Sequence, residues 1–131
     1  MRLLIDSQSL IWYVDQEHLL SPITHRAISD PANDLLLSAA TVWEIAIKVG
    51  LKKLALSLPY RVWMEKAISD LDLIILPITV ETAEVQSDLP WHHRDPFDRL
   101  IIAQALVENI SIISIDSIFD HYGISRLWCS A

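Results

Sequence analysis

The chain has 131 residues, a formal net charge of −7 and a hydrophobic fraction of 52%, which suits one domain with a real core and excludes a disordered chain. The acidic balance argues against a general nucleic-acid-binding protein, which is normally basic, but it does not exclude a nuclease whose acids bind metal. The single cysteine, Cys129, excludes an internal disulfide and a cysteine-based zinc site.

No stretch of the sequence combines the length of a membrane span with freedom from charge. The most apolar region, 35–49, contains Glu44 and Lys48 and is better explained by a strand followed by a helix. The chain begins with a strand pattern, and we find no signal peptide. We therefore expect a cytoplasmic protein with no membrane association.

Strand and helix patterns alternate along the chain, which predicts an α/β domain with a parallel sheet and helices on its faces. There are no repeats and no linkers, so residues 1–131 are expected to form a single domain. In chain order the expected elements are strand 2–6, helix 9–14, a helix from Ser21-Pro22, strand 35–38, helix 41–49 capped by Gly50, a helix from Pro59 to Asp70, strand 73–76, a helix capped by Thr79, a helix from Asp95-Pro96 to Glu108, strand 110–115, a short helix 117–121 and a final strand 126–128.

Two acidic residues follow predicted strands. Asp6 closes the first strand, and Asp116 closes the strand 110–115. Because parallel strands end at the same edge of their sheet, these two carboxylates are expected to meet there. Either could also serve as the N-cap of the helix that follows it, but capping alone does not predict a shared edge.

A third acid, Glu44, lies in a helix whose neighbouring residues are nearly all apolar. Such an acid faces either a narrow solvent-exposed stripe or a functional site. Lys48 follows four residues later, so an ordinary ion pair along the helix is the alternative interpretation.

Asp95 and Asp98 have different expected roles. Asp95 precedes Pro96 and is expected to cap the helix that starts there. Asp98 then occupies the third helical position, where it either complements the helix dipole or points back toward the sheet edge. A zinc site built from His92, His93 and Asp95 is disfavoured, because adjacent histidines cannot easily face one ion.

Clustered carboxylates repel one another unless a cation lies among them. Mg²⁺ and Mn²⁺ are hard cations that prefer oxygen ligands. The acids Asp6, Glu44, Asp98 and Asp116 therefore predict metal-dependent chemistry on a phosphate group. The tryptophans are expected to pack in the core or at an interface, although Trp91 lies beside the predicted site and stacking on RNA bases is an alternative.

Other folds with an aspartate after the first strand fit less well. A haloacid-dehalogenase-like phosphatase needs a second aspartate where this chain has Gln8, and a response regulator needs a late lysine, whereas no lysine follows Lys66. A Rossmann domain and a serine hydrolase need glycine motifs that the sequence lacks.

The sequence resembles the PIN-domain ribonucleases, and specifically the VapC-type toxins of bacterial toxin–antitoxin pairs. The segments Ser38–Lys48 and His93–Ala105 closely resemble the family's second and third acidic motifs, which are long and specific. Leu3–Ser7 resembles its first strand, and Ser114–Asp116 matches its shorter fourth motif. Relatives often have Asp-Thr-His where this chain has Asp6-Ser7-Gln8, a departure that leaves the metal site intact.

The resemblance implies a three-layer PIN-like fold, with a central parallel sheet in the order 3-2-1-4-5 and helices on both faces. It implies that the catalytic, metal-binding acids are Asp6, Glu44, Asp98 and Asp116. Five further residues are expected to line the site: the hydroxyl residues Ser7 and Ser114, and the basic residues Lys48, Arg94 and Arg99, which could contact phosphates or equally form surface ion pairs.

The function that the resemblance implies is an Mg²⁺- or Mn²⁺-dependent endoribonuclease, the toxin of a VapBC-like pair. The expected partners are an RNA substrate, a VapB-like antitoxin and a second copy in a homodimer. Two alternatives remain open: a non-catalytic PIN-like protein-binding module and a DNA-directed phosphodiesterase of the same superfamily.

Overall fold

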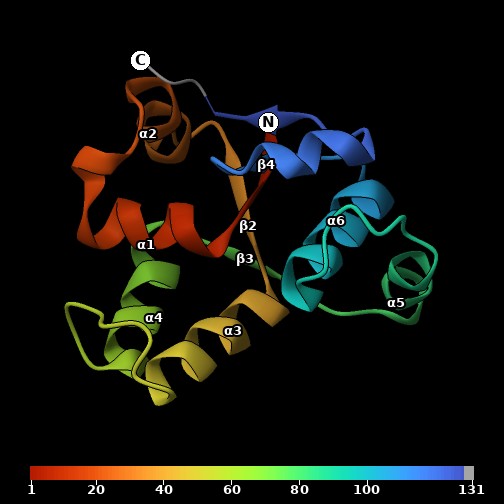
Figure 1. The fold of residues 1–131 in the computed structure, drawn as a ribbon. Helices are drawn as coiled ribbons and strands as arrows, with labels where there is room; N and C mark the ends of the chain where they lie inside the picture. Colours follow the sequence, from red (N-terminus) through yellow and green to blue (C-terminus); the bar gives the residue numbers. More distant parts are fainter. Residues whose placement is uncertain (129–131) are drawn as a thin grey trace.

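The strands form one parallel sheet with β1 at its centre. The computed structural model describes residues 1–128, so Cys129 lies outside the described range. Within this range the strand order is β3-β2-β1-β4-β5 and every pairing is parallel, which confirms the expected fold class. In the register of the sheet, Leu3 lies opposite Leu35 and Ser111. The strands shown in Figure 1 are β1 (Arg2–Ile5), β2 (Asp34–Ser38), β3 (Ile74–Leu76), β4 (Ser111–Ile113) and β5 (Arg126–Leu127).

Helices connect the strands, because parallel neighbours need a crossover over one face of the sheet. In the described residues, no helix is both long and apolar enough to cross a membrane. The helices are α1 (Ser7–Asp15), the 3-10 helix η1 (Glu17–Leu19), α2 (Pro22–Ser29), α3 (Ala39–Gly50), α4 (Tyr60–Asp70), α5 (Val80–Ser87), α6 (Pro96–Glu108) and the 3-10 helix η2 (Ser117–Tyr122).

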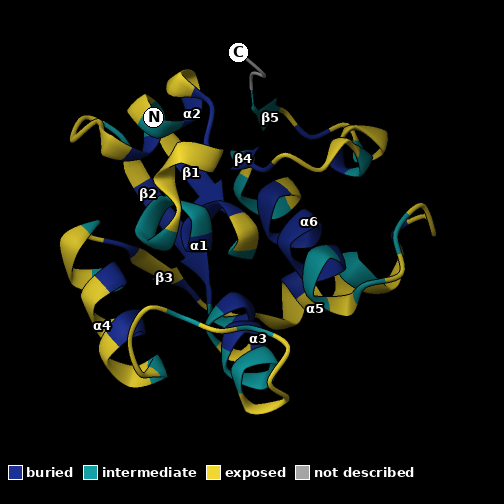
Figure 2. Cartoon of the chain, turned by 60° about the vertical axis from the view of Figure 1, so that its left-hand side comes forward, coloured by how far each residue is buried: buried dark blue, intermediate teal, exposed yellow. Residues whose placement is uncertain are grey.

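Two apolar clusters cover the two faces of the sheet. Successive strand residues point to opposite faces, so Leu3 and Ile5 join one cluster while Leu4 joins the other. The first cluster contains residues of α1, α2 and α4, including the fully buried Trp63. The second contains residues of α6 together with Phe119 of η2. Figure 2 shows the buried residues along the central strands and on the helix faces turned toward them.

Local capping signals in the sequence identified several helix starts correctly. The side chain of Ser21 accepts a hydrogen bond from the backbone N–H of Thr24, and Thr79 begins α5 with a reciprocal capping box. Asp95 caps α6, which runs over the predicted range to Glu108. These signals are reliable because each depends on residues within one turn of the helix end.

The prediction that Gly50 caps its helix is wrong. Gly50 is the last residue of α3, and the left-handed backbone conformation instead occurs at Lys52, with φ of 59°. The helix also begins earlier than expected, at Ala39, because Ser38 serves as its N-cap and accepts a hydrogen bond from the N–H of Ala40.

The fourth predicted strand is shorter than 110–115. β4 ends at Ile113, and the chain then turns so that Asp116 caps η2. Asp116 therefore lies in the connection between β4 and η2 and not at the last residue of the strand. Of the tryptophans expected in the core or at an interface, Trp43 and Trp91 are 63% and 73% exposed and do not pack in the core.

Candidate metal centre

A pocket of about 380 Å³ lies at the carboxyl-terminal edge of β1 and β4. All four acids that the sequence singled out line it, although they come from four separate parts of the chain. The predicted Ser7 and Lys48 also line the pocket. Its described lining residues are Asp6, Ser7, Gln8, Glu44, Lys48, Asp95, Asp98, Ile115, Asp116 and Phe119.

Asp6 is held rigidly at the point where β1 ends. Its backbone N–H donates to the carbonyl of Ile113, which ties it to β4. One carboxylate oxygen accepts the N–H of Ser9 at 2.8 Å, so Asp6 does cap α1 as well as face the pocket. Burial raises the pKa of Asp6; hydrogen bonds from Ser114 and Ser9 oppose that rise, and the charge of Glu44 adds to it.

Glu44 points inward from α3 and is only 3% exposed. Its Oε2 accepts a hydrogen bond from Lys48 Nζ at 2.7 Å, so the predicted ion pair along the helix is present. Its other oxygen, Oε1, is buried and has no hydrogen-bond partner among residues 1–128. The sequence left two alternatives for Glu44, an ion pair along the helix or a place in a functional site. Glu44 does both, because Oε2 pairs with Lys48 while the side chain also lines the pocket.

Asp98 approaches the pocket from the first turn of α6. Its backbone N–H donates to Asp95 Oδ1, so the cap residue also fixes the start of the turn that carries Asp98. Burial, followed by the charges of Asp95, Glu44, Asp6 and Asp116, raises the pKa of Asp98 to about 7. At neutral pH the carboxyl group therefore stands near the midpoint of its titration.

Asp116 is the most exposed of the four acids, with 47% of its side chain accessible. The Ser114 hydroxyl accepts the backbone N–H of Asp116 at 3.0 Å, and Asp116 Oδ1 accepts the N–H of Ile118. Ser114 itself is fully buried. The predicted serine thus shapes the turn between the end of β4 and Asp116.

His93 is part of this arrangement, although the sequence did not identify it as a site residue. Its Nε2 lies 2.9 Å from Asp98 Oδ2 and 3.8 Å from Asp116 Oδ2. In the part of the chain that the structure describes, these three residues form the group whose ligand-type atoms all lie within 4.8 Å of one another. The signal in the sequence was its place in the segment His93–Ala105, which carries the third acidic motif.

A family model described as the PIN domain matches residues 3–124 of the chain. The chain belongs to the PIN domain family. PIN domains are generally nucleases and use divalent metals. No curated protein matches the chain.

Several solved structures share the fold of this PIN domain. VapBC2 from Rickettsia felis, bound to a DNA fragment from its promoter, gives a TM-score of 0.74 at 14% identity, over 98% of this chain and 100% of that chain. VapBC-1 from nontypeable Haemophilus influenzae gives 0.69 at 16% identity, over 97% of each chain. FitAcB from Neisseria gonorrhoeae gives 0.66 at 19% identity, over 95% and 96%.

The donor set of this PIN domain fits a hard divalent cation. The pocket brings together carboxylate oxygens, which are the ligands that Mg²⁺ and Mn²⁺ prefer. The buried Glu44 Oε1 lacks a hydrogen-bond partner in the described residues, and a bound cation would satisfy it. Asp6, Glu44, Asp98 and Asp116 are therefore the residues that would hold the ion.

Arg99 was expected either to contact phosphates or to form a surface ion pair, and its burial disfavours both. Arg99 is only 3% exposed, and its guanidinium donates to the carbonyl oxygens of Gln86, Leu89, Pro90 and His93. It also lies 3.8 Å from the centre of the Trp91 ring. Arg99 therefore holds the segment before α6 in place instead of facing the acidic pocket.

Arg94 remains available to contact phosphates, because its side chain is exposed and makes no ion pair with any residue in 1–128. Lys48 already pairs with Glu44. Burial acts to lower the pKa of the Lys48 ammonium, but the hydrogen bond to Glu44 and the negative charge of Glu44 together raise it.

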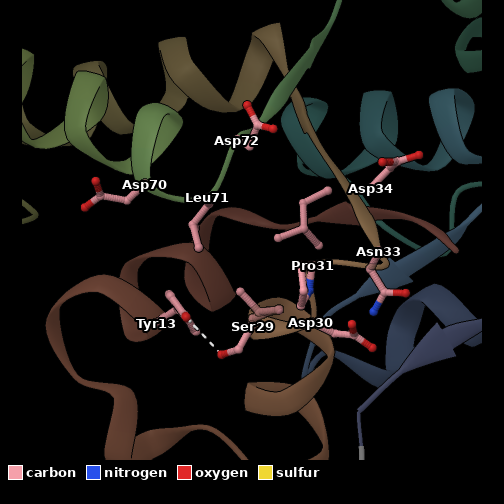
Figure 3. Close-up of a pocket in the computed structure, with 11 residues that line it drawn as sticks. Tyr13, Ser29, Asp30, Pro31, Asn33, Asp34, Asp70, Leu71 and Asp72 are labelled. Carbon is pink, nitrogen blue, oxygen red and sulfur yellow. Dashed lines mark hydrogen bonds between the residues drawn. The ribbon is translucent and has the colours of Figure 1, made fainter.

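A second acid-lined pocket, of about 270 Å³, lies where β2 begins and α4 ends (Figure 3). Asp30, Asp34, Asp70 and Asp72 surround it, and all four are exposed. Asp30 Oδ1 accepts the N–H of Ala32, a short-range bond typical of an acid in a turn. These four acids are exposed to solvent, unlike the buried Asp6 and Glu44, so solvent screens their charges and they have less need of a metal ion.

Proposed function

We propose that the protein is an Mg²⁺- or Mn²⁺-dependent endoribonuclease and the toxin of a VapBC-like toxin–antitoxin pair. The proposal takes residues 1–131 as one PIN-like domain. The observation that carries it is the convergence of Asp6, Glu44, Asp98 and Asp116 on one pocket. Such a concentration of partly buried negative charge is unfavourable unless the pocket takes up a cation.

The chain's own residues would divide the work. Asp6 is the most rigid of the four acids, because it is tied to β4 and to the first turn of α1, and it would be the central ligand. Glu44 would contribute its unpaired Oε1, and Asp98 and Asp116 would complete the set. When bound, the ion would supply the Lewis acidity that activates a water molecule and stabilises charge on the phosphate.

Positive side chains near the acids are suited to the phosphate backbone. Lys48 lines the pocket and Arg94 is exposed on the segment that leads into α6. Ser7 lines the pocket at the start of α1, and Ser114 supports Asp116 from behind. These contacts carry no sequence information, so they would position an RNA strand without selecting its bases.

The antitoxin partner rests on the similar structures, which include VapBC and FitAB assemblies. We propose that a VapB-like protein binds this chain and blocks the pocket, and that two copies of the chain form a homodimer in the cytoplasm of a prokaryote.

Cleavage of RNA by the purified, antitoxin-free protein tests the proposal. RNA and single-stranded DNA of the same sequence would be incubated with Mg²⁺, with Mn²⁺ and with EDTA. The variant Asp6→Asn keeps an oxygen that can accept the N–H of Ser9, so it should fold while losing a charged ligand. Asp34→Asn, in the second acid-lined pocket, is the matched control.

We expect discrete RNA cuts that require the metal and disappear in Asp6→Asn but not in Asp34→Asn. Cleavage of DNA alone would favour the DNA-directed phosphodiesterase. A folded protein that cuts neither polymer with either metal would favour the non-catalytic binding module. Equal cleavage by Asp6→Asn and the wild type would contradict the site assignment.

A further inference from the structure

His93 is fixed from several directions before it reaches the acids. Its backbone N–H donates to the Tyr122 hydroxyl at 2.8 Å, and its carbonyl accepts from Arg99 at 3.2 Å. The ring lies against Phe119, with 6.3 Å between the two ring centres, and the side chain is 17% exposed. A histidine restrained in this way presents its ring to Asp98 and Asp116 in one orientation.

The hydrogen bond on the far side of the ring determines where the proton lies. Nδ1 accepts the backbone N–H of Asp95 at 3.2 Å, so Nδ1 uses its lone pair and carries no proton. A neutral imidazole then has its proton on Nε2. The contact with Asp98 agrees, because a proton on Nε2 gives that edge of the ring a positive partial charge 2.9 Å from a carboxylate oxygen.

This tautomer conflicts with a role as a metal ligand. The distances alone would allow His93 to join Asp98 and Asp116 around a cation. Metal coordination through Nε2, however, requires the lone pair that the proton occupies, and moving the proton to Nδ1 would set it against the N–H of Asp95. An N–H group that lies close to two carboxylates has a different use, which is to attract them through its positive partial charge and hold them in place.

We propose that His93 is a positioning residue of the acidic site: it keeps its Nε2 proton, lies against Asp98 and Asp116, and holds these acids in place for a cation without binding the cation itself. Asp98 Oδ2 then faces the imidazole, which leaves the other oxygen of Asp98 for the ion. The inference rests on the proposed metal centre and adds a residue to it.

The structure also gives Arg99 a part in this role. Arg99 donates to the carbonyl of His93 and to three other carbonyls of the segment 86–93, so it fixes the backbone from which His93 projects. Asp95 contributes twice, since its N–H orients the His93 ring while its carboxylate caps the helix that carries Asp98. His93 and Asp98 are thus held to each other through Asp95 as well as by their direct contact.

Histidine nitrogen NMR tests the tautomer without any activity measurement. Spectra of the metal-free protein and of the protein with diamagnetic Mg²⁺ would be assigned with the variants His93→Ala and His92→Ala. We expect the His93 signal to show a protonated Nε2 and an unprotonated Nδ1 in both states. Loss of the Nε2 proton when Mg²⁺ is added, or a proton on Nδ1 in either state, would overturn the proposal.

Mn²⁺ titration by calorimetry measures the positioning. We expect His93→Ala to bind Mn²⁺ about 10- to 100-fold more weakly than the wild type. His93→Gln keeps an N–H near the position of Nε2 and should recover much of the lost affinity. His92→Ala, at a neighbouring exposed residue that stacks on His121, should bind as the wild type does.

Two calorimetric outcomes count against the inference. Wild-type affinity in a folded His93→Ala would show that the acids need no help, and a His93→Gln variant as weak as His93→Ala would show that the N–H is not what matters. If the protein binds Mn²⁺ as predicted but cuts no RNA, the proposed ribonuclease function fails while the role of His93 stands. If it binds neither metal, the proposed metal centre and the positioning role fail together.

Discussion

Lys48 Nζ lies 2.7 Å from Glu44 Oε2, while the opposite oxygen of the same carboxylate is buried and has no hydrogen-bond partner within residues 1–128. Lys48 therefore satisfies Oε2 of Glu44 and leaves Oε1 free to bind a cation in the pocket. The Lys48 ammonium forms an ion pair with the buried carboxylate, so it acts as a counter-ion where no metal is bound. This division explains why Glu44 tolerates nearly complete burial.

Removing the ammonium should destabilise the metal-free protein. Because Lys48→Ala leaves Glu44 Oε2 without its donor, we expect the free energy of unfolding at pH 8 in EDTA to fall by about 1–3 kcal/mol. A divalent cation would replace the missing charge, so the gain in melting temperature on adding Mn²⁺ should be larger in Lys48→Ala than in the wild type. Lys53→Ala, at an exposed residue outside the pocket, is the control. An equal Mn²⁺ effect in all three proteins would contradict the counter-ion role.

The stability of the metal-free protein should fall as the pH rises from about 4 to 7. The pKa of Asp98 is 3.8 in the unfolded chain and about 7 in the folded one, so in this window the folded state holds a proton that the unfolded state has lost. Asp6, whose pKa is also raised, acts in the same direction. A tenfold change in an acid dissociation constant corresponds to about 1.4 kcal/mol, so the free energy of unfolding should fall by a few kcal/mol in total. Melting temperatures in EDTA at pH 5 and pH 8 measure this loss, and a protein that is more stable at pH 8 would refute the assignment.

Replacing Asp98 by asparagine should remove much of that pH dependence. Asp98→Asn carries no charge at any pH, so at pH 8 in EDTA we expect it to be more stable than the wild type by about 1–3 kcal/mol. At pH 5, where Asp98 is largely protonated, the two proteins should melt at similar temperatures. The same variant should bind Mn²⁺ more weakly, because a neutral amide oxygen is a poorer ligand for a hard cation. Chemical unfolding at both pH values measures the difference, and Asp88→Asn, at an exposed residue, is the control.

Arg99 should matter for stability far more than its neighbour Arg94. Arg99→Ala would remove one donor from each of four carbonyl oxygens, of which Gln86 and Pro90 keep the Leu89 N–H and the Tyr122 hydroxyl. Arg99→Lys cannot reach all four carbonyls with one ammonium. We expect either change to lower the free energy of unfolding by about 3 kcal/mol. Arg94→Ala, at an exposed side chain, should change it by less than about 0.5 kcal/mol. A loss of RNA binding in folded Arg99→Lys without any loss of stability would restore the phosphate role that the structure argues against.

The positions of the acids along the chain were largely predictable. Asp6 follows a short apolar run that predicts a buried strand, and Asp95-Pro96 marks a helix start that places Asp98 in the first turn. These features depend on hydrogen bonds and periodicities that span a few residues. The end of β4 was placed two residues too late, because Ile115 is apolar yet 47% exposed, and hydropathy alone does not distinguish it from Ile113.

By itself, the sequence determined the alternation of strands and helices, most helix starts and the identity of the acids, because each is specified by local pattern and capping. Only the tertiary structure decided that Glu44 faces inward with one oxygen unpaired, that Arg99 turns away from the acids and that His93 turns toward them. Those outcomes depend on contacts between residues that the chain separates widely, such as Tyr122 with His93 and His93 with Asp116. Local sequence does not determine whether a charged side chain is exposed or buried, because that depends on how the sheet and helices pack around it.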